Sequence, residues 1–350
     1  MAKAPSVSIA MATFNGEKYI EAQLKSLAAQ TILPSELVVT DDGSADRTLE
    51  IVGAFKKDAK LSVKIFRNET RLGYEENFLK AAKLCSGEYV AYSDQDDVWF
   101  PNKLAKCCEA LSDPSVMLCI HSADTWSPDR GTGHRHPDFA KTDTLTIDRN
   151  NPLMSYSGFA LVFRRFLLDL IDNSMRPRTV HSLGGPPMLM NHDEWVWFLG
   201  CSLGGVVQLQ DSLAFYRQHD SNTHGAPKKR NVKRMLELAI SQTKYRELSI
   251  LERECAQLLL HNLGDLDSGK VASLRKTITK FETKAKMHEW RGAIYDDKSN
   301  ITTRMKSFSQ ILGLGGYSDL KDANGKVTLG RMAAVKDAFF GVTGIFKLLR

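Results

Sequence analysis

Short apolar runs alternate with helical patterns along the first third of the chain, and no other feature limits the possible fold as strongly. The runs, which we predict to be strands, occupy residues 7–13, 36–40, 62–66, 88–93 and 116–121. Between them, apolar residues recur at helical spacing in 16–29, after 44 and in 74–84. This alternation with short links predicts an α/β fold with a mostly parallel, doubly wound sheet flanked by helices.

Three of the predicted strands are followed directly by polar residues. The polar segments are Thr13-Phe14-Asn15, Asp41-Asp42-Gly43-Ser44 and Asp94-Gln95-Asp96-Asp97. Doubly wound sheets bind their ligands at the carboxyl ends of the strands. We therefore expect the three segments to meet at one edge of the sheet and to form a binding site there.

The middle of the chain is less regular. Residues 125–144 are rich in Pro, Gly, His and Asp, which predicts a loop, and Gly184-Gly185-Pro186-Pro187 predicts a mobile loop. Strands are predicted at 157–164, 206–208 and 213–217, and a helix is predicted at 191–203.

The two parts of the chain carry opposite charge. Residues 1–227 hold 23 Lys and Arg against 28 Asp and Glu, a balance of −5, whereas residues 228–350 hold 24 against 13, a balance of +11. Ala226-Pro227, followed by Lys228-Lys229-Arg230, marks the change. We therefore predict two domains, an α/β domain over 1–227 and a basic helical domain over 228–350.

The basic region ends in an amphipathic segment. Helical patterns cover 232–260 and 271–290, and glycines at 313–316 interrupt them. An apolar stripe follows, with basic residues beside it; its members are Met332, Val335, Phe339, Val342, Ile345, Phe346 and Leu349. Such a segment can lie on a membrane surface, and the alternative is that it packs on the protein's own core. A basic region could also bind nucleic acid, but no known nucleic-acid motif accompanies it, so we expect none as a partner.

Cysteine usage and hydropathy give the expected compartment. The sequence contains no run of about 20 apolar residues and no signal-peptide core. Its six cysteines form no C-x-x-C pair, so we expect free buried thiols rather than a zinc site. We therefore expect a cytoplasmic protein, with peripheral contact to the inner face of a membrane through the basic region.

The acidic segment Asp94-Gln95-Asp96-Asp97 is a candidate metal site. Like charges packed this closely are costly unless a cation neutralises them, and oxygen ligands suit Mg²⁺ or Mn²⁺. The alternative is a solvated acidic turn before the helix that begins near Pro101.

Three further segments can carry chemistry. A carboxylate in Asp41-Asp42-Gly43-Ser44 can accept a hydrogen bond from a base or a ribose, although the segment is also typical of a turn. Neither the dinucleotide fingerprint nor the P-loop is present, so phosphates would be held by a metal. In His192-Asp193-Glu194-Trp195 a carboxylate beside an apolar wall can act as a general base, or merely favour a helix N-terminus. Tyr216-Arg217-Gln218-His219 offers a phosphate contact and a metal ligand, or structural hydrogen bonds.

In this order and spacing, these segments resemble glycosyltransferase family 2, the inverting enzymes with the GT-A fold, and most of all its bacterial rhamnosyltransferase-like members. The resemblance covers about residues 5–225 and does not reach the basic tail. It rests on the three strand-end segments and on the segments at 192–195 and 216–219.

The resemblance implies a role for particular residues. The nucleotide-sugar site would include Thr13, Phe14, Asn15, Glu17, Asp41, Arg71, Asn77, Asp94 and Trp99. Asp41 would bind the base, and Trp99 would stack on a sugar unless it only anchors the next helix. Asp96 would ligate Mg²⁺ or Mn²⁺, with His219 as a further metal or phosphate contact. Asp193 would be the catalytic base, with its neighbour Glu194 as the alternative.

The function that the resemblance implies is transfer of a sugar from a dTDP- or UDP-linked donor, with dTDP-rhamnose as one candidate. The acceptor would be a hydroxyl of a surface polysaccharide or of a lipid-linked glycan. Two alternatives stay open: a nucleotidyltransferase, which would release pyrophosphate, and a non-catalytic scaffold that binds glycans or membranes.

Overall fold

The structure is a computed structural model, and it describes residues 5–127, 129, 131–154, 156–179, 188–219, 239–262, 266–317, 320–321, 327–328 and 330–348. The chain divides into two compact units, and each is described by itself. The first comprises Met1–Met175 and Asn191–Ala226, and the second comprises Arg176–Met190 and Pro227–Arg350. The predicted boundary between 227 and 228 and the predicted loop at 184–187 both lie outside the described residues.

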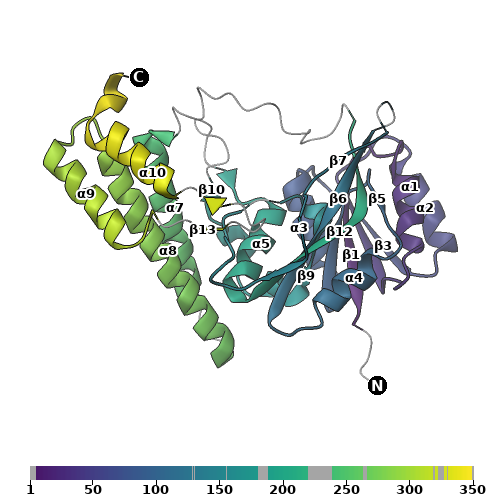
Figure 1. Cartoon of the computed structure of the whole chain (residues 1–350). Helices are drawn as coiled ribbons and strands as arrows, with labels where there is room; N and C mark the ends of the chain where they lie inside the picture. Colours follow the sequence, from purple (N-terminus) through teal and green to yellow (C-terminus); the bar gives the residue numbers. More distant parts are fainter. Residues whose placement is uncertain are drawn as a thin grey trace. The chain divides into compact units, whose positions relative to one another are not determined.

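The first unit is built on a sheet whose leading half is parallel (Figure 1). The strands β1 (Val7–Thr13), β2 (Glu36–Asp41), β3 (Ser62–Arg67) and β4 (Tyr89–Ser93) lie in the order β3-β2-β1-β4. β1, β2 and β4 are buried along their whole length, as parallel strands covered on both faces are, and therefore appear as unbroken apolar runs. In register, Thr13 pairs with Asp41, and Met11 pairs with Ser93, so the carboxyl ends of these strands meet at one edge.

The other half of the sheet mixes strand directions. β9 (Leu161–Arg164) is antiparallel to β4 and to β6 (Val116–Ser127), and β6 is parallel to β12 (Gly205–Arg217). β5 (Val98–Trp99), β7 (Gly131–Arg135) and β8 (Asp143–Leu145) are short antiparallel additions to β12, β6 and β12.

Two predictions for this half were wrong. The expected loop at 125–144 contains the end of β6, all of β7 and the start of β8. The two strands expected at 206–208 and 213–217 form the single strand β12, whose pairing with β6 shifts between Leu209 and Ser212 and again before Phe215. Both errors have a physical cause, because β7 is exposed along its length and irregular pairing breaks the alternation of β12.

Helices cover both faces of the sheet. The right-handed connections of a parallel sheet place α1 (Ile20–Ala28) and α2 (Thr48–Asp58) on one face and α3 (Tyr74–Lys83) on the other (Figure 1). α5 (His192–Leu203) packs beside α3, and α4 (Lys103–Ala110) packs on β6 and β12. Short 3-10 helices complete the unit: η1 (Gly158–Ala160), η2 (Arg165–Asp169) and η3 (Asn173–Met175). The predicted mostly parallel α/β sheet flanked by helices is confirmed.

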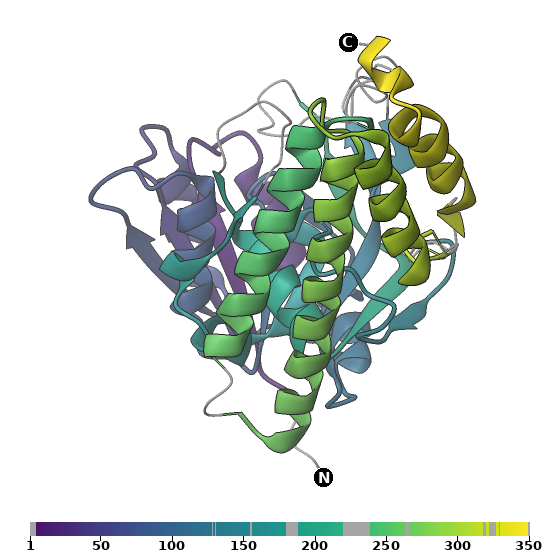
Figure 2. The same ribbon diagram turned by 90° about the vertical axis from the view of Figure 1, so that its left-hand side faces the viewer.

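The second unit is helical, as predicted for the C-terminal region. α7 (Gln242–His261), α8 (Ser268–Ile294) and α9 (Ile301–Gly313) run side by side (Figure 2). α10 (Gly330–Lys336), the π-helix η4 (Asp337–Val342) and the 3-10 helix η5 (Ile345–Leu348) follow them. Two small hairpins pair β10 (Arg178–Thr179) with β11 (Met188–Leu189) and β13 (Leu320–Lys321) with β14 (Val327–Thr328).

The predicted apolar stripe of the tail divides between core and surface. Phe346 is fully buried in the core of the second unit, with Tyr245, Ile294, Tyr295 and Ile311 among its members. In contrast, Met332, Val335 and Phe339 are exposed to 63%, 67% and 55%. One part of the stripe therefore packs in the core of the second unit, and another part is exposed.

Two further observations bear on the sequence predictions. All six cysteines are free and buried, as expected. Within the described part of the chain, every helix is too short or too polar to cross a membrane.

Candidate active site

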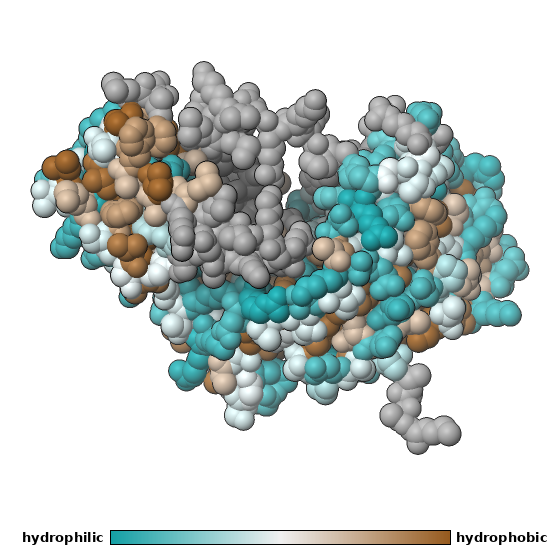
Figure 3. All heavy atoms as spheres, in the orientation of Figure 1, coloured by the Kyte–Doolittle hydropathy of each residue, from teal (hydrophilic) through white to brown (hydrophobic). Residues whose placement is uncertain are grey.

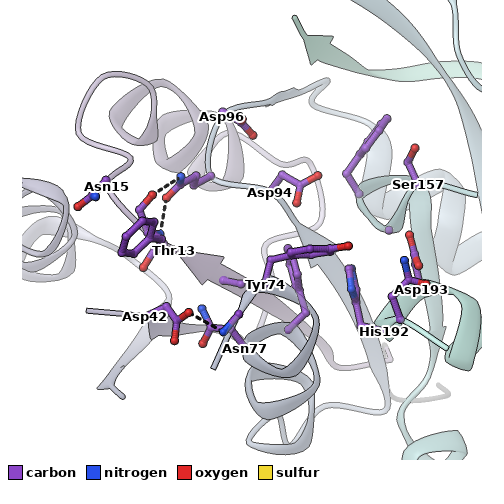
Figure 4. A pocket seen from close by; sticks show the side chains of 18 of the residues that line it. Thr13, Asn15, Asp42, Tyr74, Asn77, Asp94, Asp96, Ser157, His192 and Asp193 are labelled. Carbon is purple, nitrogen blue, oxygen red and sulfur yellow. Dashed lines mark hydrogen bonds between the residues drawn. The ribbon is translucent and has the colours of Figure 1, made fainter. Parts of the chain in front are cut away.

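A cavity of about 600 Å³ opens at the carboxyl ends of the strands of the first unit. Figure 4 shows Asp42 and Asn77 at one end of it, Ser157 and Asp193 at the other, and Asp94 between them. Nine of the residues predicted to form the site line this cavity: Thr13, Phe14, Asn15, Arg71, Asn77, Asp94, Asp96, Asp193 and His219. Segments far apart in the sequence thus lie together at the carboxyl ends of the strands, as we predicted from the strand order.

Asp41, which we expected to bind the base, is not part of the cavity lining. Its side chain is fully buried and accepts hydrogen bonds from the backbone N–H groups of Gly43 (3.2 Å) and Ser44 (2.9 Å) and from the Thr13 hydroxyl (3.0 Å). The carboxylate therefore shapes the turn after β2, where Gly43 has a φ of +88°. Asp41 lies two positions before Gly43 and three positions before Ser44, a spacing that is typical of such a turn, so the sequence contains a signal for this role.

The next residue, Asp42, faces the cavity instead. Its carboxylate accepts hydrogen bonds from the backbone N–H groups of Leu72 (2.6 Å) and Gly73 (2.8 Å) and from the Asn68 amide (3.0 Å). These bonds hold the segment before α3 against the end of β2. Asp42 thereby replaces Asp41 as the acidic residue at this end of the cavity.

Arg71 and Phe14 form an adjoining part of the wall. The Arg71 guanidinium lies 4.0 Å from the centroid of the Phe14 ring and 4.0 Å from an Asp42 oxygen, and most of its side chain is exposed. The backbone of Phe14 is fixed by Gln95, whose side-chain amide accepts from the Phe14 N–H and donates to the Phe14 carbonyl, both at 3.0 Å. The loop that carries Phe14 is thus held in place, and the Arg71 cation lies over the face of the Phe14 ring.

The carboxylates after β4 are crowded together. Asp94 and Asp96 line the cavity, whereas Asp97 is fully buried behind them and accepts a hydrogen bond from the Arg217 N–H (3.0 Å). Burial, followed by repulsion from Asp96 and Asp193, raises the pKa of Asp94 to about 8. Burial, followed by repulsion from Asp96 and Asp94, raises the pKa of Asp97 well above its usual range. The site therefore holds more negative charge than its surroundings balance.

The end of β12 supplies partners for Asp96. His219 Nε2 lies 2.8 Å from Asp96 Oδ2, and the imidazole stacks on Tyr19 with 4.5 Å between ring centroids. Arg217 Nε donates to the Asp96 carbonyl at 2.6 Å. The side chains of Asp96 and His219 are thus oriented toward each other from distant segments.

Two of these side chains are of kinds that can ligate a divalent cation. Asp96 and His219 offer a carboxylate and an imidazole, and Asp94 lies in the same cavity. No group of three or more His, Cys, Asp or Glu that could hold a metal ion exists among the described residues.

At the far end of the cavity, the start of α5 separates the two candidate bases. Glu194 is buried and forms a capping box with Asn191, whose backbone N–H donates to Glu194 Oε2 at 3.2 Å. Asp193 lines the cavity, and one of its oxygens accepts from the Glu194 N–H at 2.8 Å. Of the two carboxylates, Asp193 lines the cavity and Glu194 does not.

His192 fixes the position of this helix start. Its ring stacks on Phe78 with 4.3 Å between centroids and meets Tyr74 and Tyr92 edge-on. A Cβ on Gly158 would lie 2.7 Å from His192 Nε2, so only glycine fits there without displacing the ring.

Lys103 lies beneath the carboxylates and was not anticipated from the sequence. It is fully buried, donates from Nζ to the Phe159 carbonyl at 2.6 Å and lies 3.4 Å from the centroid of the Trp99 ring. Burial lowers the pKa of Lys103 to about 7. A lysine in a surface-like helical pattern gave no sign of this position.

Two other predicted site residues are not brought to the cavity. Trp99 is buried under Lys103, which agrees with the alternative that it anchors the following helix. Glu17 is exposed outside the cavity lining, and its carboxylate accepts a hydrogen bond from the Arg47 N–H at 3.0 Å.

Curated proteins similar in sequence to this chain include bacterial glycosyltransferases. The chain is 28% identical over 217 residues to uncharacterized proteins of Mycobacterium bovis and Mycobacterium tuberculosis, an alignment that covers 61% of this chain and 59% of theirs. It therefore spans about six tenths of the length of these relatives. Over 105 residues it is 34% identical to a dTDP-rhamnosyl transferase of Shigella flexneri, covering 29% of this chain and 36% of that protein.

Among solved structures, the chain resembles Staphylococcus aureus TarS, residues 1–349, in complex with UDP-GlcNAc. The TM-score is 0.54 at 18% sequence identity, and the alignment covers 98% of this chain and 92% of that one. At this identity the likeness concerns the fold. The sequence itself matches the profile described as "Glycosyl transferase family 2" over residues 8–171. The matched segment, which is a little under half of the chain, contains all three predicted strand-end polar segments.

Proposed function

We propose that the first unit is an inverting glycosyltransferase that moves a sugar from a nucleoside-diphosphate donor to an acceptor hydroxyl. The observation that carries the proposal is the shared cavity, along which the proposed base, cation site and nucleoside site lie one after another. Asp193 lies at one end, Asp94 and Asp96 lie in the middle, and Asp42 and Asn77 lie at the other end (Figure 4).

The nucleoside would bind at the end formed by Asp42, Asn77 and Phe14. Asp42 can accept a hydrogen bond from a base or ribose, and the Phe14 ring with the Arg71 guanidinium can pack against a flat base. Asn77, whose amide donates to the Thr40 carbonyl at 2.9 Å, is held firmly at the bottom of this end.

The diphosphate would lie beside Asp94, Asp96 and His219. Mg²⁺ or Mn²⁺ held by Asp96 and His219 would supply positive charge next to the leaving diphosphate. Arg217, which orients the Asp96 backbone, keeps this pair in place. Burial and then repulsion from Asp96 and Asp193 raise the pKa of Asp94, and the crowding of acidic groups favours binding of a cation here.

The acceptor would bind at the Asp193 end. Asp193 takes the proton of the attacking hydroxyl while the acceptor oxygen bonds to the anomeric carbon. The bond from that carbon to the diphosphate oxygen breaks on the opposite side, and the nucleoside diphosphate leaves with the electron pair. One displacement of this kind inverts the anomeric centre, and Asp193 later releases the proton to solvent.

The first donor to test is dTDP-rhamnose, because a dTDP-rhamnosyl transferase is among the relatives of the N-terminal part. UDP-linked sugars form the second group. Thermal shift with each donor in the presence of Mn²⁺ identifies the ligand, since a ligand that binds only the folded state raises the melting temperature.

The decisive test compares two neighbouring carboxylates. We expect Asp193→Asn to lower kcat about 10³-fold while donor binding stays the same. Glu194→Gln keeps an acceptor for the capping box and should retain kcat within about threefold, because the residue is not part of the cavity lining. Normal turnover by Asp193→Asn would refute the assigned base. Pyrophosphate release would indicate a nucleotidyltransferase, and absence of nucleotide binding would indicate a scaffold.

A further inference from the structure

The second unit carries an apolar face that its own core leaves uncovered. Seven large hydrophobic side chains between residues 301 and 339 are exposed to 48–67%: Ile301, Met305, Leu312, Leu314, Met332, Val335 and Phe339. Figure 3 shows hydrophobic atoms gathered over α9 and α10, at the left end of the view. We call these seven residues the apolar face.

Helical geometry aligns these residues. On α9, Ile301, Met305 and Leu312 are four and seven positions apart, which places them on one side of the helix. On α10 and η4, Met332, Val335 and Phe339 are three and four apart and likewise share one side. α9 packs against η4, so the two rows belong to neighbouring elements.

Basic side chains predominate in the described segments that carry the apolar face, although Asp297, four positions before Ile301, is exposed. Residues 298–317 contain no Asp or Glu, and residues 330–348 contain only Asp337, which is fully buried and paired with Arg291 and Lys336. Exposed basic side chains are present in the same segments, among them Lys298, Lys306 and Lys347. A surface that combines exposed apolar residues with a majority of cations is complementary to an anionic lipid surface.

The neighbouring helices α7 and α8 carry both signs of charge, although α8 is also rich in Lys and Arg. α7 and α8 both present acidic side chains to solvent, and Arg253 pairs there with Glu289. Soluble proteins rarely leave a large contiguous apolar patch exposed unless the patch has a partner.

We propose that the apolar face of α9, α10 and η4 docks on the surface of a membrane that contains anionic phospholipids. Met332, Val335 and Phe339, with the residues of α9, would enter the interfacial layer while Lys306 and its neighbours contact the headgroups. The inference rests on this surface alone and does not depend on the reaction assigned to the first unit. If both hold, the surface would bring the enzyme to acceptors that are themselves attached to lipid.

Vesicle co-sedimentation of the full chain tests the proposal. We expect binding to vesicles of phosphatidylcholine with phosphatidylglycerol, weaker binding to phosphatidylcholine alone, and loss of binding as salt is raised. The variant Met332→Ser/Phe339→Ser should bind about thirtyfold more weakly, because two apolar side chains no longer enter the interface. The matched control is Ile250→Ser/Leu260→Ser, which removes two apolar side chains of similar exposure from α7 and should bind like the unchanged protein.

Charge is tested separately. Lys306→Glu should weaken binding to the anionic vesicles about tenfold, whereas Arg275→Glu on α8 should have little effect. Unchanged melting temperatures would show that all variants fold, as expected for exposed positions. The proposal fails if the two double variants bind equally, or if neutral and anionic vesicles bind alike. It also fails if the Met332→Ser/Phe339→Ser variant instead abolishes a dimer, because the face would then join two copies of the chain.

Discussion

Both units of the molecule bury acidic groups, but they surround them differently. In the second unit, Asp337 contacts Arg291 Nε at 3.0 Å and Lys336 Nζ at 2.9 Å and accepts hydrogen bonds from the hydroxyls of Tyr295 (2.7 Å) and Tyr317 (2.9 Å). Burial alone would raise the pKa of Asp337, but Lys336 and Arg291 outweigh it and the pKa is lowered. In the first unit, burial and then repulsion from neighbouring carboxylates raise the pKa values of Asp94 and Asp97, and the nearby Lys103 does not offset them.

We infer that the buried carboxylate of the second unit stabilises the fold, whereas the carboxylates of the first unit are arranged for ligand binding. A buried carboxylate with its full set of partners stabilises the folded state, and removing it leaves buried cations unpaired. Carboxylates crowded at a cavity oppose folding slightly and become favourable when a cation binds. Substitutions in the two places should therefore affect different properties.

The largest effect is expected for the cavity. Asp96→Ala should lower kcat/KM about 10³-fold, because it removes the carboxylate partner of His219 and the predicted metal ligand. The free energy of unfolding should stay the same or rise, since a repulsive charge is lost. Steady-state kinetics and urea unfolding measure the two quantities, with the exposed Asp58→Ala on α2 as control. A large loss of stability without loss of activity would break the comparison.

Asp337→Asn should have the opposite outcome. We expect the free energy of unfolding to fall by about 4 kcal/mol, because Arg291 and Lys336 lose their buried counter-charge. Catalysis by the molecules that remain folded should be unaffected. Urea unfolding measures the change, and Glu282→Gln at an exposed position of the neighbouring helix α8 is the control.

Glu36, in the first unit, is a buried carboxylate whose contribution to stability depends on pH. Burial would raise the pKa of Glu36, but hydrogen bonds from Lys64, Ser8 and Ser86 outweigh it and lower the pKa to about 2. A lowered pKa means that the charged form is favoured by folding, so its stabilising effect is present above pH 4.5 and is lost as the pH falls toward 2.

Glu36→Gln should therefore lower the free energy of unfolding by about 3 kcal/mol at pH 7. The difference from the unchanged protein should shrink as the pH is lowered from 4.5 to about 2, which unfolding curves over that range would measure. Glu21→Gln, at an exposed position whose pKa is lowered only by the solvent-screened pair with Lys25, should show a much smaller dependence. A difference that is constant with pH would mean that the charge of Glu36 does not contribute.

The smallest effect is expected at the rim of the cavity. Arg71→Ala removes a mostly exposed cation from the face of the Phe14 ring, which should raise the donor KM about threefold and leave kcat unchanged. Lys18→Ala, another exposed cation over an aromatic ring, lies outside the cavity lining and should change neither constant. A change in kcat instead would place Arg71 at the reacting atoms.

The sequence predicted the leading half of the sheet because fully buried parallel strands appear as apolar runs with polar residues at their ends. β7 could not be predicted in this way, since all its residues are exposed and it has no apolar alternation. Which of Asp41 and Asp42 lines the cavity depends on a local turn, which the spacing of the motifs does not reveal. Lys103 was missed because its burial depends on a contact with the Phe159 carbonyl, 56 positions away in the chain.

Gln95 stands between the two acidic side chains of the cavity and binds both backbone groups of Phe14. Ordering of the acidic loop by a cation would therefore also order the loop that presents Phe14, and the reverse holds equally. Linkage requires such coupling to be mutual, so a metal and a nucleotide should each tighten the binding of the other by the same factor. Cooperation between the two ligands would then be a property of one glutamine side chain.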